Sequence, residues 1–173
     1  MKYSFSHLFL ILTLLFLAVP ASSFEVPAGS QQISLDSQLF YYEDQNAALS
    51  FDEAVALYKK GEMTKNSNGI LNFGFSDSVF WVRTAFRFSS DLSADESWIV
   101  SLDYAPLENV DLFIMQGGNS QHFTSGTSQP FTNRAVLHRN LIYPIKNYGE
   151  TEYEVWLRVE SDSSIQLPLS LWT

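Results

Sequence analysis

The chain has 173 residues, of which 10 are Lys or Arg and 19 are Asp or Glu, and its formal net charge is −9. Such an acidic chain repels phosphate backbones and anionic lipid surfaces, so nucleic acid is not expected as a partner. The chain contains no Cys, and 15% of its residues are aromatic, which favours a domain stabilised by an aromatic core instead of disulfides.

The first 23 residues have the composition of a secretory signal peptide. Lys2 gives a positive start, and the run from Leu8 to Val19 that follows is apolar except for one Thr. This run is shorter than the roughly 20 apolar residues of a membrane-spanning helix. Small residues around Ala21 predict cleavage after it, with Ser23 as the second choice and an uncleaved anchor as the alternative. We expect residues 24–173 to form one periplasmic domain.

The amino-terminal part of this domain combines a strand with a helix. Gln31 to Tyr42 is predicted as the opening strand. Ser50 and Glu53 form a capping box, in which each residue satisfies a backbone group of the other. Apolar residues then recur at helical spacing, so a short helix is predicted over residues 51–60. Gly61 ends it.

After Gly69 the hydrophobic pattern has a period of two. Apolar and polar residues alternate in short runs separated by turn residues, which is typical of a sandwich or barrel. We predict a two-sheet antiparallel sandwich of about eight strands. Pro168 indicates an edge position or a bulge in the last strand. The runs cover residues 80–88, 98–104, 110–114, 139–146, 152–160 and 165–171, and a Gly-Gly turn lies at 117–118.

Two of these strands carry the same outward-facing Trp-x-Arg unit. Trp81 and Arg83 lie opposite the apolar set of one strand, and Trp156 and Arg158 do so in the other. An indole beside a guanidinium suits a sugar ring, because the indole covers its C–H surface and the guanidinium reaches its hydroxyls. The alternative is that the helix or the amino-terminal strand covers this face. The Trp residues would then be a second core layer and the Arg residues structural ion pairs, which is the commoner use of such residues.

Six segments of the sequence follow the order and spacing of one known family. Together they resemble the type 2 extracellular sensor domain of bacterial seven-transmembrane receptors with diverse intracellular signalling modules. The resemblance runs from about Leu39 to Trp172 and implies a jelly-roll-like β-sandwich similar to carbohydrate-binding modules. The segments are FYYED at 40–44, LNFGFSDSVFWVR at 71–83, VDLF at 110–113, PF at 130–131, HRN at 138–140 and WLRVES at 156–161.

The resemblance also implies partners in the same polypeptide. In the family, seven membrane helices and a cytoplasmic histidine kinase or diguanylate cyclase follow this domain. The sequence given ends at Thr173, so a receptor fragment and a free-standing relative are both open. Either would be a non-catalytic periplasmic sensor, and its most plausible ligand is a carbohydrate-like small molecule.

The candidate ligand-binding residues are the two Trp-x-Arg units together with His138, Arg139 and Asn140. A strand-capping role is the alternative for these last three, because most polar residues at the ends of elements satisfy backbone groups. A rival function is dimerisation, or docking to a partner domain, through the face that carries Trp81 and Trp156.

Metal binding and catalysis have weaker support. Asp77 is a candidate calcium ligand, with Asp103 or Asp111 as companions, although the sequence contains no EF-hand loop. The two His residues of the mature chain are not at zinc-ligand spacing. The sequence has no nucleophile elbow, Walker loop or kinase signature. We therefore expect no enzyme and no cofactor other than calcium.

Overall fold

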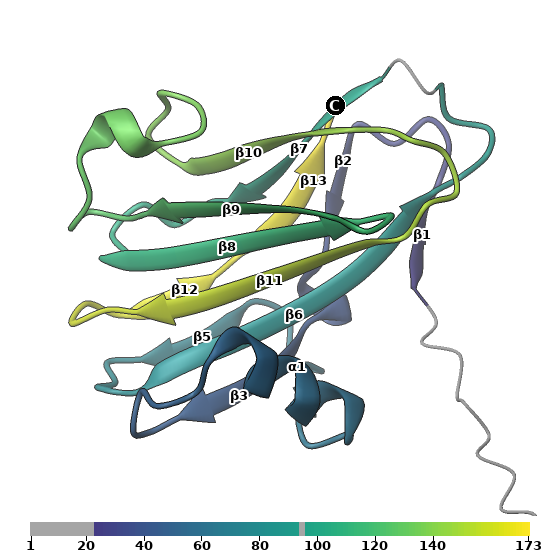
Figure 1. Cartoon of the computed structure of the whole chain (residues 1–173). Coiled ribbons are helices and arrows are strands. Elements are labelled where there is room, and N and C mark those ends of the chain that lie inside the picture. The colour runs from purple at the N-terminus through teal and green to yellow at the C-terminus, as the bar shows by residue number, and fades with distance from the viewer. Residues whose placement is uncertain (1–22, 94–95) are drawn as a thin grey trace, which may run out of the picture.

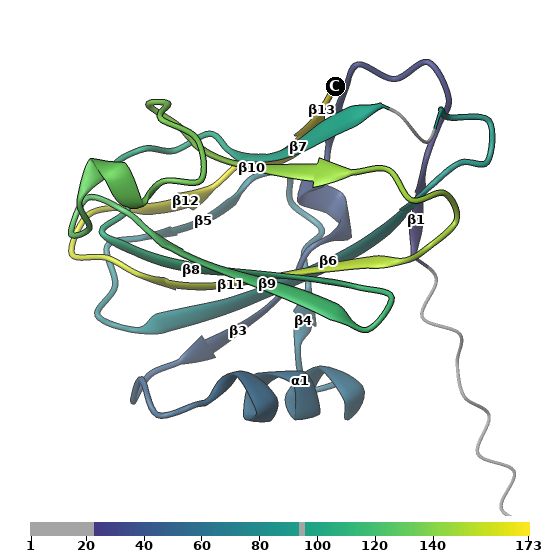
Figure 2. The same ribbon diagram turned by 45° about the horizontal axis from the view of Figure 1, so that its top comes forward.

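The computed structural model describes residues 23–93 and 96–173. The predicted signal peptide lies outside these residues, apart from Ser23. Two β-sheets face each other, and a helix covers the outer face of the larger one (Figures 1 and 2). No helix in the described part of the chain has the length and hydrophobicity of a membrane-spanning segment.

The larger sheet has seven strands. Its order is β4-β3-β6-β11-β8-β9, and β1 pairs in parallel with β6 outside this path. The other pairings in this sheet are antiparallel. Its strands are β1 (Phe24–Val26), β3 (Phe40–Asp44), β4 (Thr64–Lys65), β6 (Val79–Phe88), β8 (Asn109–Gln116), β9 (Asn119–Ser125) and β11 (Tyr153–Glu160).

The smaller sheet has four strands in the order β10-β7-β13-β2, and two further strands form a separate pair, β12-β5. Because β9 and β10 are each paired on one side only, each forms an edge of its sheet. The strands are β2 (Gln32–Ser34), β5 (Leu71–Gly74), β7 (Ser97–Leu102), β10 (Leu141–Lys146), β12 (Ile165–Leu167) and β13 (Leu169–Trp172).

The helix α1 (Phe51–Lys59) has the predicted capping box. The Ser50 Oγ accepts a hydrogen bond from the backbone N–H of Glu53, and the Glu53 carboxylate accepts one from the backbone N–H of Ser50. The hydrogen bonds that the backbone N–H and the hydroxyl of Ser50 donate to the Glu53 carboxylate lower the pKa of Glu53. The 3₁₀ helices η1 (Asp36–Gln38) and η2 (Phe131–Asn133) lie in connections.

The main core fills the space between the two sheets. Alternate residues of β6, including Phe80, Val82 and Phe86, point inward and pack with the inward residues of the smaller sheet. The remaining positions of β6 point to the outer face of the sheet, where Val79 and Trp81 belong to a second buried cluster with Ala54 of α1. The structure confirms the predicted all-β sandwich with one short helix.

Four details of the predicted element pattern are wrong. The first strand is interrupted at Asp36, whose carboxylate accepts a hydrogen bond from the backbone N–H of Leu169 at 3.0 Å. The last strand is divided at Pro168 into β12 and β13, which belong to different sheets. Residues 119–125 form strand β9, which the alternating pattern did not reveal. The described residues contain thirteen strands instead of about eight.

Candidate functional site

The face that carries the two Trp-x-Arg units is covered by α1. Trp81 is 1% exposed, Trp156 0% and Arg83 4%. The ring of Phe51, the first residue of the helix, lies 6.2 Å from that of Trp81 and 5.7 Å from that of Trp156. The indole faces are therefore closed to a sugar ring. The prediction of an exposed Trp platform for a sugar ring is therefore wrong. The alternative prediction, a second core layer beneath the helix, is confirmed.

Arg83 is held in this layer by polar contacts on several sides. Its NH1 donates to the Tyr58 hydroxyl at 2.8 Å, and its NH2 lies 3.3 Å from the carboxylate of Glu154. The same carboxylate oxygen accepts a hydrogen bond from the indole N–H of Trp156 at 3.2 Å. A buried guanidinium needs such partners, because an unpaired buried charge is costly. Arg83 thus fastens α1 to the sheet.

The segment His138-Arg139-Asn140 organises the entry to β10. The Asn140 side chain donates to the Asp103 carboxylate at 2.9 Å, and its backbone N–H donates to His138 Nδ1 at 3.1 Å. Arg134 donates to the carbonyl oxygens of His138 and Arg139. These contacts agree with the strand-capping alternative, although the side chains of His138 and Arg139 are exposed.

The three candidate calcium ligands lie in different parts of the fold. Asp77 is exposed in the β5–β6 connection, and Asp103 follows β7 in the smaller sheet. Asp111 is on β8 of the larger sheet, where its carboxylate contacts His122 at 3.0 Å and Thr124 at 2.7 Å. Within 23–93 and 96–173, no group of three or more His, Cys, Asp or Glu residues could hold a metal ion.

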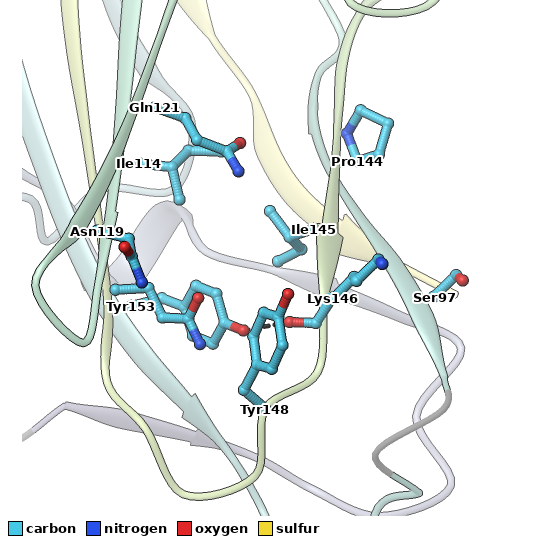
Figure 3. Close-up of a pocket in the computed structure, with 10 residues that line it drawn as sticks. Ser97, Ile114, Asn119, Gln121, Pro144, Ile145, Lys146, Tyr148 and Tyr153 are labelled. Atoms are coloured by element: carbon cyan, nitrogen blue, oxygen red, sulfur yellow. Dashed lines mark hydrogen bonds between the residues drawn. The ribbon is translucent and has the colours of Figure 1, made fainter.

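A cleft of about 410 Å³ opens elsewhere, between the two edge strands β9 and β10 (Figure 3). In Figure 3, Ile114 and Gln121 face Ile145 across the cavity, and Tyr148 stands beside Tyr153. Its lining residues are Ser97, Ile114, Gln116, Asn119, Gln121, Pro144, Ile145, Lys146, Tyr148 and Tyr153.

The cleft exists because the inward positions of β9 change character along the strand. Near the carboxyl end, Phe123 packs against Tyr143 of β10 with ring centroids 5.3 Å apart, and the two sheets are in contact there. Towards the β8–β9 turn the inward positions are Gln121 and Asn119, which are exposed. Burying an amide without a hydrogen-bond partner is unfavourable, so the sheets stay apart at this end.

The polar groups in the walls of the cleft are neutral, with one exception. The side-chain amides of Gln116, Asn119 and Gln121 make no hydrogen bond within the described residues, so their donors and acceptors are available. Tyr148 is 58% exposed and offers an aromatic face at the rim. Lys146 is the one charged residue of the lining, and its side chain extends towards Ser97, away from Gln121 (Figure 3).

Two buried tyrosines lie at or near the cleft: Tyr153 lines it, and Tyr143 is on β10, two residues before the lining residue Ile145. The Tyr153 hydroxyl donates to the carbonyl oxygen of Lys146 and so ties β11 to the end of β10. Burial raises the pKa of Tyr153 to about 12. Burial likewise raises the pKa of Tyr143 to about 12, although the nearby Ser125 hydroxyl opposes the shift. Both hydroxyls stay protonated at neutral pH, so they add no charge to the cleft.

Comparison with known proteins decides the family. The family model described as 7TMR-DISM extracellular 2 matches residues 36–173, which is most of the chain. The chain belongs to this family. The 7TMR-DISM extracellular 2 domain is an extracellular sensor domain of seven-transmembrane receptors, and the resemblance noted in the sequence is confirmed. No curated protein matches the chain.

One solved structure similar to this 7TMR-DISM extracellular 2 domain is a family GH115 4-O-methyl-α-glucuronidase, BtGH115A, with specificity for decorated arabinogalactans. The sequence identity is 12% and the TM-score 0.38, and the match covers 82% of this chain and 17% of that chain. The chain thus spans less than a fifth of that enzyme. A likeness of this size supports no conclusion about activity.

None of the cleft residues was among the candidate site residues from the sequence. Gln116, Asn119 and Gln121 flank the Gly117-Gly118 turn on the two strands of a hairpin. The Gly-Gly pair predicts a turn, and hairpin geometry then implies a strand of matching length after it. That strand has few apolar residues, so its alternation was not visible.

Proposed function

We propose that this chain is the ligand-binding part of an extracellular sensor, and that it recognises a small, neutral, polyhydroxylated molecule of the carbohydrate class in the cleft between β9 and β10. The observation that supports this most is the set of three unpaired amides beside an exposed tyrosine, with no charged side chain turned inward. The domain is a binding module and not an enzyme.

The chemistry of the lining fits such a ligand. Side-chain amides both donate and accept hydrogen bonds, as sugar hydroxyls do. The apolar face of a pyranose can stack on Tyr148, since aromatic rings favour contact with C–H surfaces. Binding sites typically combine a mostly apolar wall with a few placed polar groups, and Ile114, Ile145 and Pro144 supply that wall.

In the proposed setting the domain lies in the periplasm and passes ligand occupancy to membrane helices that follow it, with a histidine kinase or a diguanylate cyclase as output. Two observations test this placement. The exported product should begin at Ser22, as read by mass spectrometry, and an intact Met1 would contradict export with cleavage. The DNA downstream of the Thr173 codon should encode membrane helices in the same frame.

A glycan array followed by titration calorimetry tests the ligand class. We expect saturable binding of a neutral saccharide and no binding of a carboxylated one of the same size, because no side-chain cation reaches into the cleft. Failure of every neutral saccharide to bind would contradict the proposal. Release of a cleaved product during incubation would instead indicate hydrolysis and would contradict the non-catalytic role.

A further inference from the structure

Strand β9 is a long edge strand that lacks the residues that usually prevent edge-to-edge pairing. Among the described strands at sheet edges, β2 has three residues, β4 two and β1 three. The edge strand β10 has six residues but contains Pro144 and Lys146, and proline and lysine are two of the devices that prevent edge-to-edge pairing. Strand β9 has seven residues and contains neither Pro nor any Lys, Arg, Asp or Glu.

The hairpin geometry tells which backbone groups of β9 are unused. Gly117 and Gly118 have φ values of 53° and 84°, as a two-residue type I′ turn requires. Gln116 and Asn119 then form a hydrogen-bonded pair, and such pairs alternate along the hairpin. Every second residue of β9 therefore points its N–H and C=O away from β8. These residues are Ser120, His122 and Thr124, and all three are exposed.

The side chains of these residues leave the backbone edge open. The His122 ring stacks on Phe113 with centroids 4.3 Å apart, and its Nε2 lies 3.0 Å from the Asp111 carboxylate. Thr124 donates to the same carboxylate at 2.7 Å. The side chains are thus held on the outer face of the larger sheet, to one side of the plane in which a further strand would pair.

We propose that β9 pairs with β9 of a second copy of this chain, antiparallel, about a two-fold axis at His122. The pairing places Ser120 of one copy opposite Thr124 of the other, and the two His122 residues opposite each other. Each of the three pairs brings two backbone hydrogen bonds, so the two larger sheets become one continuous sheet. A second copy fits because the strand is self-complementary about its centre and hydroxyl pairs across strands are favourable.

Charge repulsion between two copies is expected to be smaller at β9 than on most of the surface. The whole domain is acidic, so two copies repel each other in most orientations. Strand β9 brings no carboxylate of its own to the contact. Of the carboxylates near it, Asp111 is paired with His122 and Thr124 and Glu154 with Arg83, while Glu152 lies near the Ser120 end of the strand. The contact is a narrow one, so we expect a weak dimer that forms in a concentration-dependent way.

Sedimentation equilibrium of the processed chain over a wide concentration range measures this dimer. Because Ser120 faces Thr124 across the axis, the double variant Ser120→Lys and Thr124→Lys places like charges directly opposite each other. We expect it to raise the dimer dissociation constant about tenfold or more. The double variant Ser120→Glu and Thr124→Glu should behave in the same way, and an equimolar mixture of the two should associate again.

The matched control is the double variant Gln32→Lys and Ser34→Lys, which places two Lys residues on β2, another edge strand. This control should dimerise with the same dissociation constant as the unchanged chain. Thermal melts show that each variant is folded. A chain that stays monomeric throughout, a dimer that both β9 variants leave unchanged, or a mixture that does not associate would each overturn the proposal. Ser120 and Thr124 do not line the cleft, so saccharide binding is read out separately and can fail independently.

Discussion

Arg83 and Arg158 occupy the same position in the two Trp-x-Arg units, and each lies across a strand pair from the Trp of the other unit. Arg83 is opposite Trp156, and Arg158 is opposite Trp81. Their side chains are nevertheless 5% and 24% exposed, because α1 covers one end of this face and not the other. The two arginines are therefore a natural matched pair for measuring what the buried layer contributes.

Arg83→Ala should destabilise the domain by about 3 kcal/mol, because it leaves Glu154 partly buried without its cation and removes the partner of the Tyr58 hydroxyl. Arg158→Ala removes a surface ion pair with Glu160 at 3.3 Å and should cost about 0.5 kcal/mol. Urea denaturation of the two variants gives the comparison. Equal losses of stability would show that α1 does not depend on the Arg83 contacts.

Alkaline pH should weaken the fold through Tyr143 and Tyr153. Burial raises the pKa of each from 10.0 to about 12. The stability that each neutral hydroxyl provides is therefore complete below pH 10 and is lost as the pH rises from 10 to 12. The unfolding midpoint should fall over this window, and Tyr143→Phe combined with Tyr153→Phe should reduce the fall.

The control for this experiment is Tyr148→Phe, since Tyr148 is 58% exposed. It should leave the alkaline loss of stability as it is in the unchanged chain. If the double variant loses stability between pH 10 and 12 as steeply as the unchanged chain, other groups cause the loss and the assignment is wrong.

Asp103, one of the candidate calcium ligands, should stabilise the fold through its hydrogen bonds. It accepts hydrogen bonds from Ser101 and Asn140, and from Ser170 at 3.3 Å, and so connects β7, β10 and β13. Asp103→Ala should cost about 2 kcal/mol, because it leaves these donors unpaired. Asp77→Ala removes an exposed carboxylate that makes no hydrogen bond or ion pair with another described residue, and it should change the free energy of unfolding by less than about 0.5 kcal/mol. Thermal melts of the two variants compare their losses of stability. A larger loss in Asp77→Ala than in Asp103→Ala would contradict this account.

The sequence predicted an element correctly where a single local feature determines it. The capping box at Ser50 predicted the start of α1, and strict alternation predicted β6 and β11. Periodicity predicts one strand over residues 165–171, because it cannot show that Pro168 moves the chain from the β12-β5 pair to the smaller sheet. The Trp-x-Arg face was ambiguous for a related reason. Alternation places Trp81 and Trp156 on the outer face, but only tertiary packing brings α1 over it.

The cleft could not be predicted, because the polar residues that line it on β8 and β9 show no hydrophobic alternation. Gln116, Asn119 and Gln121 belong to a polar hairpin, and a polar stretch after a Gly-Gly turn resembles a loop. The cavity also depends on the spacing between β9 and β10, which are partners in neither sheet. Only the packing of Phe123 on Tyr143 at one end, and its loss at the other, creates the opening.

The most direct test of the central claim is calorimetric titration of the double variant Gln121→Ala and Tyr148→Ala with the saccharide that the unchanged chain binds, beside Arg158→Ala as a surface control. Both substituted cleft residues are exposed, so the thermal melt should stay unchanged while the affinity falls at least about tenfold, the equivalent of one lost hydrogen bond and one stacking contact. Arg158→Ala should bind as the unchanged chain does. Binding that survives the cleft variant, or that is lost in Arg158→Ala instead, would contradict a ligand site between β9 and β10.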